Sequence, residues 1–557
     1  MKTLLIFFGV VFYNTLTYAQ TSFLLPKIKE ESSAVSLKSA RLLGEDGTIK
    51  IEGTGSIKIF TTASLTVKDA IANLGDGSNF VIQSDANLIQ INNTSTNIGN
   101  VVSEREFKIG TARNQYNYVG TPVAFSSGQS FKTIFPGTTN TTVLYHNQTS
   151  NTFSTSSGAN IPGRGLAVKE PPSTTVVTGG KTTAQFKGVA QNGTITIAIA
   201  NRDINSTTYG YNLVGNPYPS NIDLKKLFSL NGGKEQNNIS ASFYLWDNNA
   251  NDIFVQQGNS YQGQAYGIYN ALAGSKGTGT AAVGFRNTEI EAPKKPSNIL
   301  KVGQGFMTKS LKSTYDFQFD NSIRSHQIPL VDFLGKGIVE DDRYWLKMTA
   351  PSGITSTLAV VHYAGGNNGF GPEDSVSLGG SDALYSVVGN EKLAIDGRDI
   401  MTLSDVIFLG SHHFVSDNYT LELEAAEGIF ANGQNIYLKD SETGKITNLS
   451  QDHYVFKAVA GESSQRFEII YKAAAVLATK ENQNQEIIVY RDRNDFVVQA
   501  KIHKIDEIDV YDSTGKLILK RNPHSMKFYL PAQSLVSGVY LLKIRQGTKI
   551  TTKKVLR

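Results

Sequence analysis

The chain has 557 residues, with 53 Lys and Arg against 48 Asp and Glu, and 40% of its residues are hydrophobic. This length predicts three or four domains, and the absence of Cys excludes disulfides, thiol chemistry and a lipid on an N-terminal cysteine. The basic excess lies in residues 487–557, which hold 14 Lys and Arg against 6 Asp and Glu. The slightly acidic remainder lacks the basic footprint of a nucleic-acid-binding protein.

The N-terminal residues 1–19 are predicted to be a signal peptide. Lys2 precedes an apolar run from Leu4 to Tyr13, and Thr17-Tyr18-Ala19 supplies small residues for cleavage after Ala19. The run is too short to cross a bilayer core of about 30 Å as a helix. No later segment approaches 18 consecutive apolar residues, so we expect an exported protein without a transmembrane anchor.

Residues 20–110 are predicted to form a β-repeat or meander. Short apolar segments recur from Ile49 to Ile91 and are separated by Gly, Asn and Asp. Their regular spacing suits either the rungs of a short β-helix-like stack or the edge of a β-sandwich.

Residues 111–330 contain an internal repeat. The segment 116–122 (YNYVGTP) returns as 211–217 (YNLVGNP), and 163–169 (GRGLAVK) returns as 303–309 (GQGFMTK). The order is preserved, which predicts a duplicated β-sandwich region. The second copy is longer, and we place its insertion near residues 231–296. A repeated scaffold with one elaborated set of loops is typical of a binding surface.

The insertion is rich in aromatic residues. Exposed Tyr and Trp rings stack on sugar rings, although such residues also occur in strand cores. Under the first interpretation, the candidate glycan contacts are Tyr244, Trp246, Tyr261 and Tyr266.

An acidic and amide segment follows within the insertion. Asp247, Asn249 and Asp252 carry oxygen atoms of the kind that bind Ca²⁺, but the segment lacks the Gly and the distal Glu of an EF-hand loop. We therefore expect no cofactor or metal, with a Ca²⁺ site at these residues as the alternative to a solvated turn.

Residues 331–472 are predicted to form a further β-sandwich, and 473–486, which lack β periodicity, a linker. The Thr443-Gly444-Lys445 segment is a hairpin signal between two of its alternating strands. Together with 211–220 and 303–309, this region resembles the uncharacterised stalk-like β-domains of secreted and surface proteins, a resemblance that implies no activity.

Residues 487–557 show about seven short apolar strands, which predict a small immunoglobulin-like β-sandwich. Three motifs occur in order, formed by Tyr511, Gly515 and Lys516, by Gly538, Val539, Tyr540 and Lys543, and by Lys553 and Lys554. Together they resemble the type A C-terminal sorting domain of the type IX secretion system. The Tyr-Pro-Asn-Pro turn with which that family usually opens is replaced by the proline-free segment 490–495.

The resemblance implies recognition by the outer-membrane secretion machinery and removal of the domain. It also implies delivery through the periplasm to the outer cell surface or the medium. An ordinary terminal immunoglobulin-like domain with a basic face is the alternative.

Catalytic patterns are absent from the sequence. It has no Gly-x-Ser-x-Gly segment and no His-Glu-x-x-His spacing, so we assign no catalytic residue and expect a non-enzyme. The composition and the tail favour an all-β, adhesin-like or structural surface protein built of tandem β-domains, with extracellular glycans or other cells as partners. The alternative is a polysaccharide-active enzyme or its carbohydrate-binding accessory, in which paired carboxylates would be remote in sequence.

Overall fold

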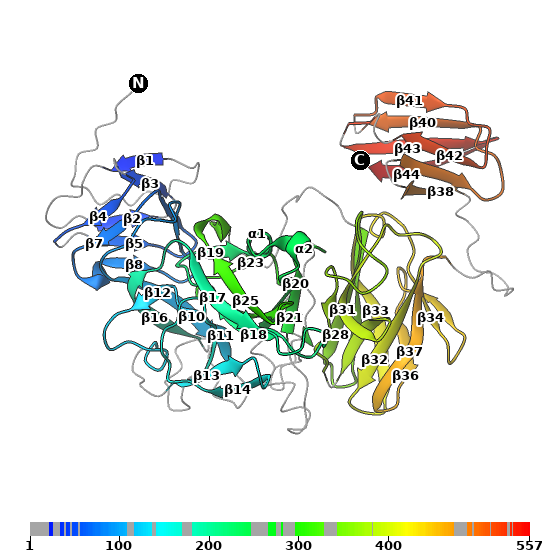
Figure 1. Cartoon of the computed structure of the whole chain (residues 1–557). Helices are drawn as coiled ribbons and strands as arrows, with labels where there is room; N and C mark the ends of the chain where they lie inside the picture. The colour runs from blue at the N-terminus through cyan, green and yellow to red at the C-terminus, as the bar shows by residue number, and fades with distance from the viewer. Residues whose placement is uncertain are drawn as a thin grey trace.

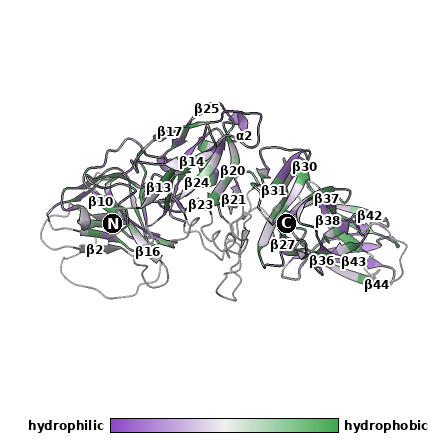
Figure 2. Cartoon of the chain, turned by 90° about the horizontal axis from the view of Figure 1, so that it is seen from below, coloured by the Kyte–Doolittle hydropathy of each residue, from purple (hydrophilic) through white to green (hydrophobic). Residues whose placement is uncertain are grey.

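The computed structural model is an all-β protein with 54% strand and 4% helix (Figure 1). Hydrophobic and hydrophilic residues are interspersed along its strands (Figure 2), as expected for β-strands whose side chains alternate between two faces. The predicted signal peptide and the predicted linker 473–486 lie outside the described residues. The structure describes residues 22–25, 34–37, 40–44, 47–53, 56–108, 116–135, 141–169, 181–246, 266–273, 280–281, 296–327, 342–380, 382–472, 487–492, 495–512, 514–531, 535–536 and 538–557.

The N-terminal region is a stack of parallel strands with three faces. Neighbouring strands within each face pair in parallel, whereas a meander would pair them antiparallel. Ile57, Leu65 and Phe80 point into the stack and are fully buried. This is the β-helix-like arrangement that the strand spacing suggested. The faces consist of β1 (Ser22–Leu25), β3 (Ala40–Gly44), β6 (Ser64–Val67) and β9 (Asn87–Gln90); of β2 (Ala34–Leu37), β5 (Ser56–Ile59), β8 (Phe80–Ile82) and β10 (Val101–Lys108); and of β4 (Ile49–Ile51) and β7 (Ile71–Asn73), with η1 (Gly77–Asn79) before β8.

The first repeat copy continues directly from this stack. Strand β10 also pairs antiparallel with β16, so one sheet runs from the stack into the copy. A single hydrophobic cluster extends from Ile49 in the stack to Ala190 in the copy. The strands of this copy are β11 (Asn117–Val119), β12 (Val123–Phe125), β13 (Thr142–Asn147), β14 (Thr152–Thr155), β15 (Leu166–Lys169) and β16 (Lys181–Ala190).

The second copy has its own core and carries the insertion. Its central sheet has the order β18-β24-β20-β21, and two short helices cover one end. The Asp223 carboxylate caps the first helix by accepting hydrogen bonds from the backbone N–H groups of Lys225 and Lys226. The elements are β17 (Ile195–Ala200), β18 (Tyr211–Gly215), β19 (Asn221–Asp223), α1 (Leu224–Leu230), α2 (Gly233–Gln236), β20 (Ile239–Trp246), β21 (Tyr266–Asn270), β22 (Thr280–Ala281), β23 (Ile299–Leu300), β24 (Gly305–Ser310), β25 (Thr314–Phe319), η2 (Asn321–Ile323) and β26 (Arg324–Ser325).

The two repeat copies are related by an approximate two-fold arrangement. In the first copy β11 pairs with β15 (Tyr118↔Ala167), and in the second β18 pairs with β24 in the equivalent register (Leu213↔Met307). Reciprocal backbone hydrogen bonds cross between the copies, from Gly120 N to Gly303 O at 3.0 Å and from Gly215 N to Gly163 O at 2.9 Å. Equivalent atoms of both copies thus make equivalent contacts.

Close approach of the two backbones explains the glycine at this repeated position. A Cβ added to Gly215 would lie 2.4 Å from Gly120 Cα, and one added to Gly120 would lie 2.7 Å from Gly215 C. Neither position accommodates a side chain unless the backbones separate.

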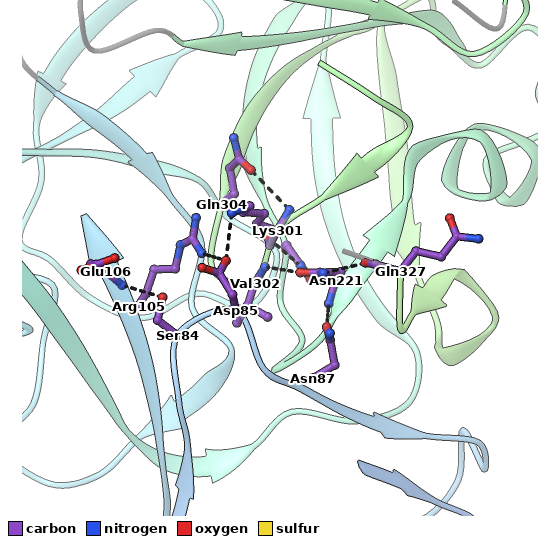
Figure 3. Close-up of polar contacts among 11 residues, drawn as sticks. Ser84, Asp85, Asn87, Arg105, Glu106, Asn221, Lys301, Val302, Gln304 and Gln327 are labelled. Carbon is purple, nitrogen blue, oxygen red and sulfur yellow. Dashed lines mark hydrogen bonds and ion pairs between the residues drawn. The ribbon is translucent and has the colours of Figure 1, made fainter. Parts of the chain in front are cut away.

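Charged and amide side chains attach the stack to the second copy (Figure 3). Asp85 accepts hydrogen bonds from Arg105 Nη1 at 2.6 Å and from Lys301 Nζ at 2.9 Å. Beside this ion pair, the Asn87 side chain accepts a hydrogen bond from the backbone N–H of Asn221 at 2.6 Å. The stack therefore contacts both copies.

The third region, 342–472, is built around one twelve-stranded sheet, in which the insertion strand β22 pairs with β28. Tyr344, Leu358 and Tyr419 are fully buried in its core. The insertion of the second copy thereby becomes part of the third region. Its strands are β27 (Asp342–Thr349), β28 (Thr355–His362), β29 (Ser375–Val376), β30 (Ala383–Val388), β31 (Glu391–Arg398), β32 (Val406–His413), β33 (Asn418–Glu427), β34 (Tyr437–Asp440), β35 (Ile446–Asn448), β36 (Tyr454–Lys457) and β37 (Gly461–Ile470).

The C-terminal module has two small sheets, of three and four strands. Their inner faces share a core that contains Phe496, Val510 and Leu542, so the module is a β-sandwich. The sheets have the orders β38-β39-β42 and β41-β40-β43-β44, with β38 (Ile487–Asp492), β39 (Asp495–Ala500), β40 (Glu507–Asp512), β41 (Leu517–Arg521), β42 (Lys527–Pro531), β43 (Val539–Gln546) and β44 (Lys549–Leu556).

Candidate functional site: an aromatic cavity at the repeat

A cavity of about 630 Å³ lies where the two repeat copies meet the third region. This volume is within the range of small-molecule sites. The described lining residues are mostly aromatic, aliphatic or neutral polar. They are Tyr116, Tyr118, Leu144, His146, Asn151, Phe153, Ala167, Thr207, Thr208, Tyr211, Trp246, Tyr266, Met307, Val376, Ser377, Leu378, Asn390, Glu391 and Lys392.

Tyr118 is the centre of the aromatic wall. Its ring stacks on that of Trp246, with centroids 5.8 Å apart and an angle of 25°, and its hydroxyl lies 2.8 Å from the Tyr266 hydroxyl. The centroid of the Phe153 ring lies 5.8 Å from that of the Tyr118 ring, and Phe153 is 39% exposed. Burial raises the pKa of Tyr118 and of Tyr266, so both phenols are neutral. The wall therefore offers uncharged rings, of which Phe153 is accessible.

Two lysine ammonium groups lie over cavity-lining rings at equivalent positions of the repeat. Lys169 Nζ is 5.0 Å from the Tyr116 ring centroid, and Lys309 Nζ is 5.7 Å from that of Tyr211. Burial lowers the pKa of each lysine. These cation–π pairs give the cavity a second feature that both copies share.

The third region is docked beside the cavity by buried hydrogen bonds. The Tyr244 hydroxyl donates to Val376 O at 3.2 Å, and Ser242 Oγ lies 2.8 Å from Ser375 Oγ. Asn270 Nδ2 lies 3.3 Å from the backbone oxygen of Asp374. These contacts hold residues 376–378 in the cavity wall.

The Asp374 carboxyl at this junction is also buried. It accepts hydrogen bonds from the backbone N–H groups of Gly371 and Gly397, each at 2.8 Å. Burial, and then the negative charges of Asp396 and Glu373, raise the pKa of Asp374 to about 8. The junction therefore contains a carboxyl group that is protonated at neutral pH.

His146 presents an unsatisfied acceptor. Asn151 Nδ2 donates to Thr208 O at 3.2 Å, which leaves Asn151 Oδ1 to accept from His146 Nε2 at 3.1 Å. Burial lowers the pKa of His146, so its Nδ1 atom is unprotonated. Nδ1 is buried and has no hydrogen-bond partner among the described residues.

The Trp246 indole presents the complementary case, because Nε1 is a buried donor without a partner in the described part of the chain.

Charged side chains are sparse among the described lining residues. Glu391 supplies the single carboxylate among the described lining residues. The adjacent Lys392 forms an ion pair with Glu462 at 2.5 Å.

The structure brings together only some of the residues singled out in the sequence. Trp246 and Tyr266 lie side by side in the cavity wall, whereas Tyr244 is 2% exposed and lies behind it. Tyr261 lies outside the described residues, as do the Ca²⁺ candidates Asp247, Asn249 and Asp252. Within the described ranges, no group of three or more His, Asp or Glu is arranged to hold a metal ion.

Sequence reasoning missed most of the other wall residues. Tyr116 and Tyr211 had a signal, because they occupy the same repeat position. His146, Phe153 and the segment 376–378 had none, because they are remote in sequence from the insertion.

The sorting motif residues lie at the turns and the last strand pair of the C-terminal module. Gly515 has a positive φ of 85° and donates its N–H to Asp512 O at 3.1 Å, closing the turn after Tyr511 and before Lys516. Gly538 and Arg557 exchange two backbone hydrogen bonds of 2.9 Å, which fasten the C-terminal residue to the start of β43. Val539, Tyr540 and Lys543 lie on β43, which pairs with the part of β44 that contains Lys553 and Lys554.

Comparison with protein families now assigns both parts of the chain. The model described as "Domain of unknown function (DUF8693)" matches residues 21–471. This chain belongs to that family. The model described as "Secretion system C-terminal sorting domain" matches residues 492–556 and thereby confirms the tail of this DUF8693 protein as a type IX sorting domain. The DUF8693 protein is therefore exported by the type IX secretion system to the cell surface or the extracellular space.

Other comparisons add little to this assignment. No curated protein matches the chain. Among solved structures, HBP35 of Porphyromonas gingivalis is 14% identical, with 28% of this chain and 60% of that chain covered and a TM-score of 0.10. PorZ of Porphyromonas gingivalis, described as an essential bacterial surface component of the type-IX secretion system, is 12% identical, with 81% and 51% covered and a TM-score of 0.11. The chain thus spans about half to three fifths of their lengths, and at these TM-scores neither likeness carries an argument.

The family matches include no catalytic family. No helix among the described residues is both long and apolar enough to cross a membrane.

Proposed function

We propose that this exported protein is a non-catalytic adhesive protein whose β-rich body binds an extracellular partner in the aromatic cavity. The observation that supports it is the cavity itself, in which aromatic rings from both repeat copies and from the insertion line one volume of about 630 Å³. Aromatic side chains dominate recognition surfaces because they bury large areas and lose little conformational freedom.

Binding rather than cleavage is favoured by the arrangement of acids. Glycoside hydrolysis ordinarily uses two carboxyl groups on either side of the scissile bond. Glu391 has no second carboxylate opposite it among the described lining residues. The cavity offers several rings and neutral polar groups instead, which suit retention of an unaltered ligand.

The proposal is tested by cell attachment. Cells that display the full chain are compared with cells that display Phe153→Ala/Tyr116→Ala, since both rings line the cavity and neither is fully buried. We expect the double variant to reduce attachment to glycan-coated surfaces and to other cells at least fivefold, at equal surface amounts.

Phe370→Ala is the matched control, because Phe370 is 47% exposed and does not line the cavity. It should leave attachment unchanged. Equal attachment by the double variant and the parent would contradict the proposal. Release of reducing ends from polysaccharides by the purified chain would contradict its non-catalytic part.

A further inference from the structure

Among the described lining residues, the Tyr211 hydroxyl, His146 Nδ1 and Trp246 Nε1 are buried without hydrogen-bond partners, and the last two are an acceptor and a donor. His146 Nδ1 requires a donor, because its Nε2 atom already donates to Asn151, and Trp246 Nε1 requires an acceptor. Both atoms are covered in the structure, so a ligand hydroxyl reaches them only when the His146 and Trp246 rings shift. Buried polar atoms are normally hydrogen-bonded, and a ligand hydroxyl group both donates and accepts. The chemistry of the wall therefore matches a ligand that carries hydroxyl groups.

The charged groups around the cavity already have partners within the protein. A cation would meet the Lys169 and Lys309 ammonium groups over Tyr116 and Tyr211. An anion would meet Glu391, whose negative charge already acts on the Lys309 ammonium group. Lys392, the remaining charged lining residue, is already paired with Glu462. The site thus favours a neutral ligand.

The aromatic rings of the cavity wall supply a surface on which a sugar ring stacks. Phe153 is accessible, and Trp246 lies across the Tyr118 ring from the same wall. Neutral polar side chains, including Asn390 and Ser377, lie among the lining residues. A pyranose ring has an apolar face for stacking and a rim of hydroxyl groups, which matches this combination.

Resting on the proposed function, we propose that the cavity binds a neutral saccharide, with one pyranose ring stacked on the aromatic wall and hydroxyl groups on His146 Nδ1 and Trp246 Nε1. A ring of this size is well within the volume of about 630 Å³, so the cavity admits a disaccharide. Both repeat copies contribute, since His146 and Tyr118 belong to the first and Trp246 to the second.

The test is isothermal titration calorimetry of the full purified chain with cellobiose, maltose, lactose and di-N-acetylchitobiose. We expect saturable binding of at least one of these neutral disaccharides. Choline chloride and glucuronate are titrated in parallel as a cationic and an anionic probe. Tighter binding of either charged probe than of every neutral sugar would overturn the proposal, and so would absence of binding by all four disaccharides.

Variants locate the binding. Phe153→Ala removes the accessible ring and should raise the dissociation constant at least fivefold. His146→Phe keeps an aromatic ring and removes the acceptor, whereas Trp246→Phe keeps a ring and removes the donor. Each of these two variants should raise the dissociation constant about threefold to tenfold. Phe370→Ala should leave it unchanged. Full affinity in all three cavity variants would overturn the assignment of this site, provided that their circular dichroism matches the parent.

The two proposals fail differently. Loss of attachment in Phe153→Ala/Tyr116→Ala, without binding of any neutral sugar, would leave the adhesive function standing and remove this ligand class. Sugar binding without an effect of the double variant on attachment would leave the saccharide ligand standing and remove the adhesive function.

Discussion

The two copies of the repeat share a scaffold but differ in what is attached to it. Both have the same strand register, the same crossing glycines and a lysine over the same tyrosine. Only the second carries the insertion, which supplies Trp246 and Tyr266 to the cavity and a strand to the third region. The second copy also reaches the N-terminal stack through Lys301 and Asn221.

This difference shows how a duplicated β-fold acquires a ligand site. The shared elements fix the spacing of the two copies through backbone contacts that accept no side chain. The unshared elements then place aromatic rings against the first copy, where Tyr118 receives them. Rigid repeats and one elaborated loop set together form a wall that neither copy provides alone.

The largest effect is expected where the copies cross. Gly215→Ala would place a Cβ 2.4 Å from Gly120 Cα, so the two backbones must separate. We expect a loss of roughly 3 kcal/mol or more in the free energy of unfolding, seen as a lower thermal midpoint or loss of folded protein. Gly120→Ala should have a similar effect, because the contact is reciprocal.

Gly369→Ala is the control for this prediction. Its nearest neighbour would be Asn367 at 3.6 Å, an ordinary van der Waals contact. It should shift the midpoint little. A Gly215→Ala protein as stable as Gly369→Ala would show that the copies are not held by this crossing.

A second test concerns the junction between the second copy and the third region. Asn270 is fully buried and its Nδ2 atom lies 3.2 Å from Pro372 O, while its Oδ1 atom accepts from the Leu272 and Ala273 N–H groups. Asn270→Ala leaves these groups without partners and should cost about 2 kcal/mol. Urea denaturation followed by Trp fluorescence measures this loss of unfolding free energy. Asn205→Ala is the control, because Asn205 is exposed.

The same junction should make stability depend on pH. The pKa of Asp374 is raised from its ordinary value of 3.8 to about 8 in the folded chain, so its contribution to stability is fully present below pH 3.8 and is lost as pH rises to about 8. Asp374→Asn should reduce this slope, which for one group is at most about 1.4 kcal/mol per pH unit. Unfolding measured from pH 4.5 to 8 compares the two slopes, and equal slopes would contradict the prediction.

Much of this architecture could be predicted from the sequence, and the reasons are local. Alternating apolar residues gave the strands, and two copies of a short glycine motif gave the duplication. The recurring strands predicted a β-helix-like stack, a meander or a sandwich edge, and the spacing alone could not choose between them. The cavity could not be derived, because Phe153, Trp246 and Leu378 meet only after the copies cross and the third region docks. Long-range pairings of this kind leave no periodic signal in the sequence.

A fourth prediction addresses the attachment of the stack to the second copy. Burial raises the pKa of Asp85, but the charges of Arg105 and Lys301 outweigh it and the pKa is lowered. The resulting stabilisation is present above the unfolded pKa and is lost as pH falls through the folded pKa. Asp85→Asn keeps a residue that tolerates the positive φ of 63° and should cost about 1 kcal/mol at pH 7, and less at pH 3. A cost independent of pH would assign the effect to packing.

The smallest effect on stability is expected for the two lysines that both copies share. Lys169→Met and Lys309→Met each remove a cation from above a tyrosine and keep a chain of similar length. Each should cost about 0.5–1 kcal/mol in unfolding free energy, because these are partly solvated cation–π pairs. If the copies are equivalent as scaffold, the two costs should agree within error, and the double variant should show their sum, since the lysines belong to separate pairs. Removal of both cations should also relax the discrimination against choline at the cavity, a change that a purely structural role would not produce. A larger cost for Lys309→Met would be assigned to the hydrogen bond that Lys309 Nζ donates to Ser206 O at 2.9 Å, which lies outside the insertion.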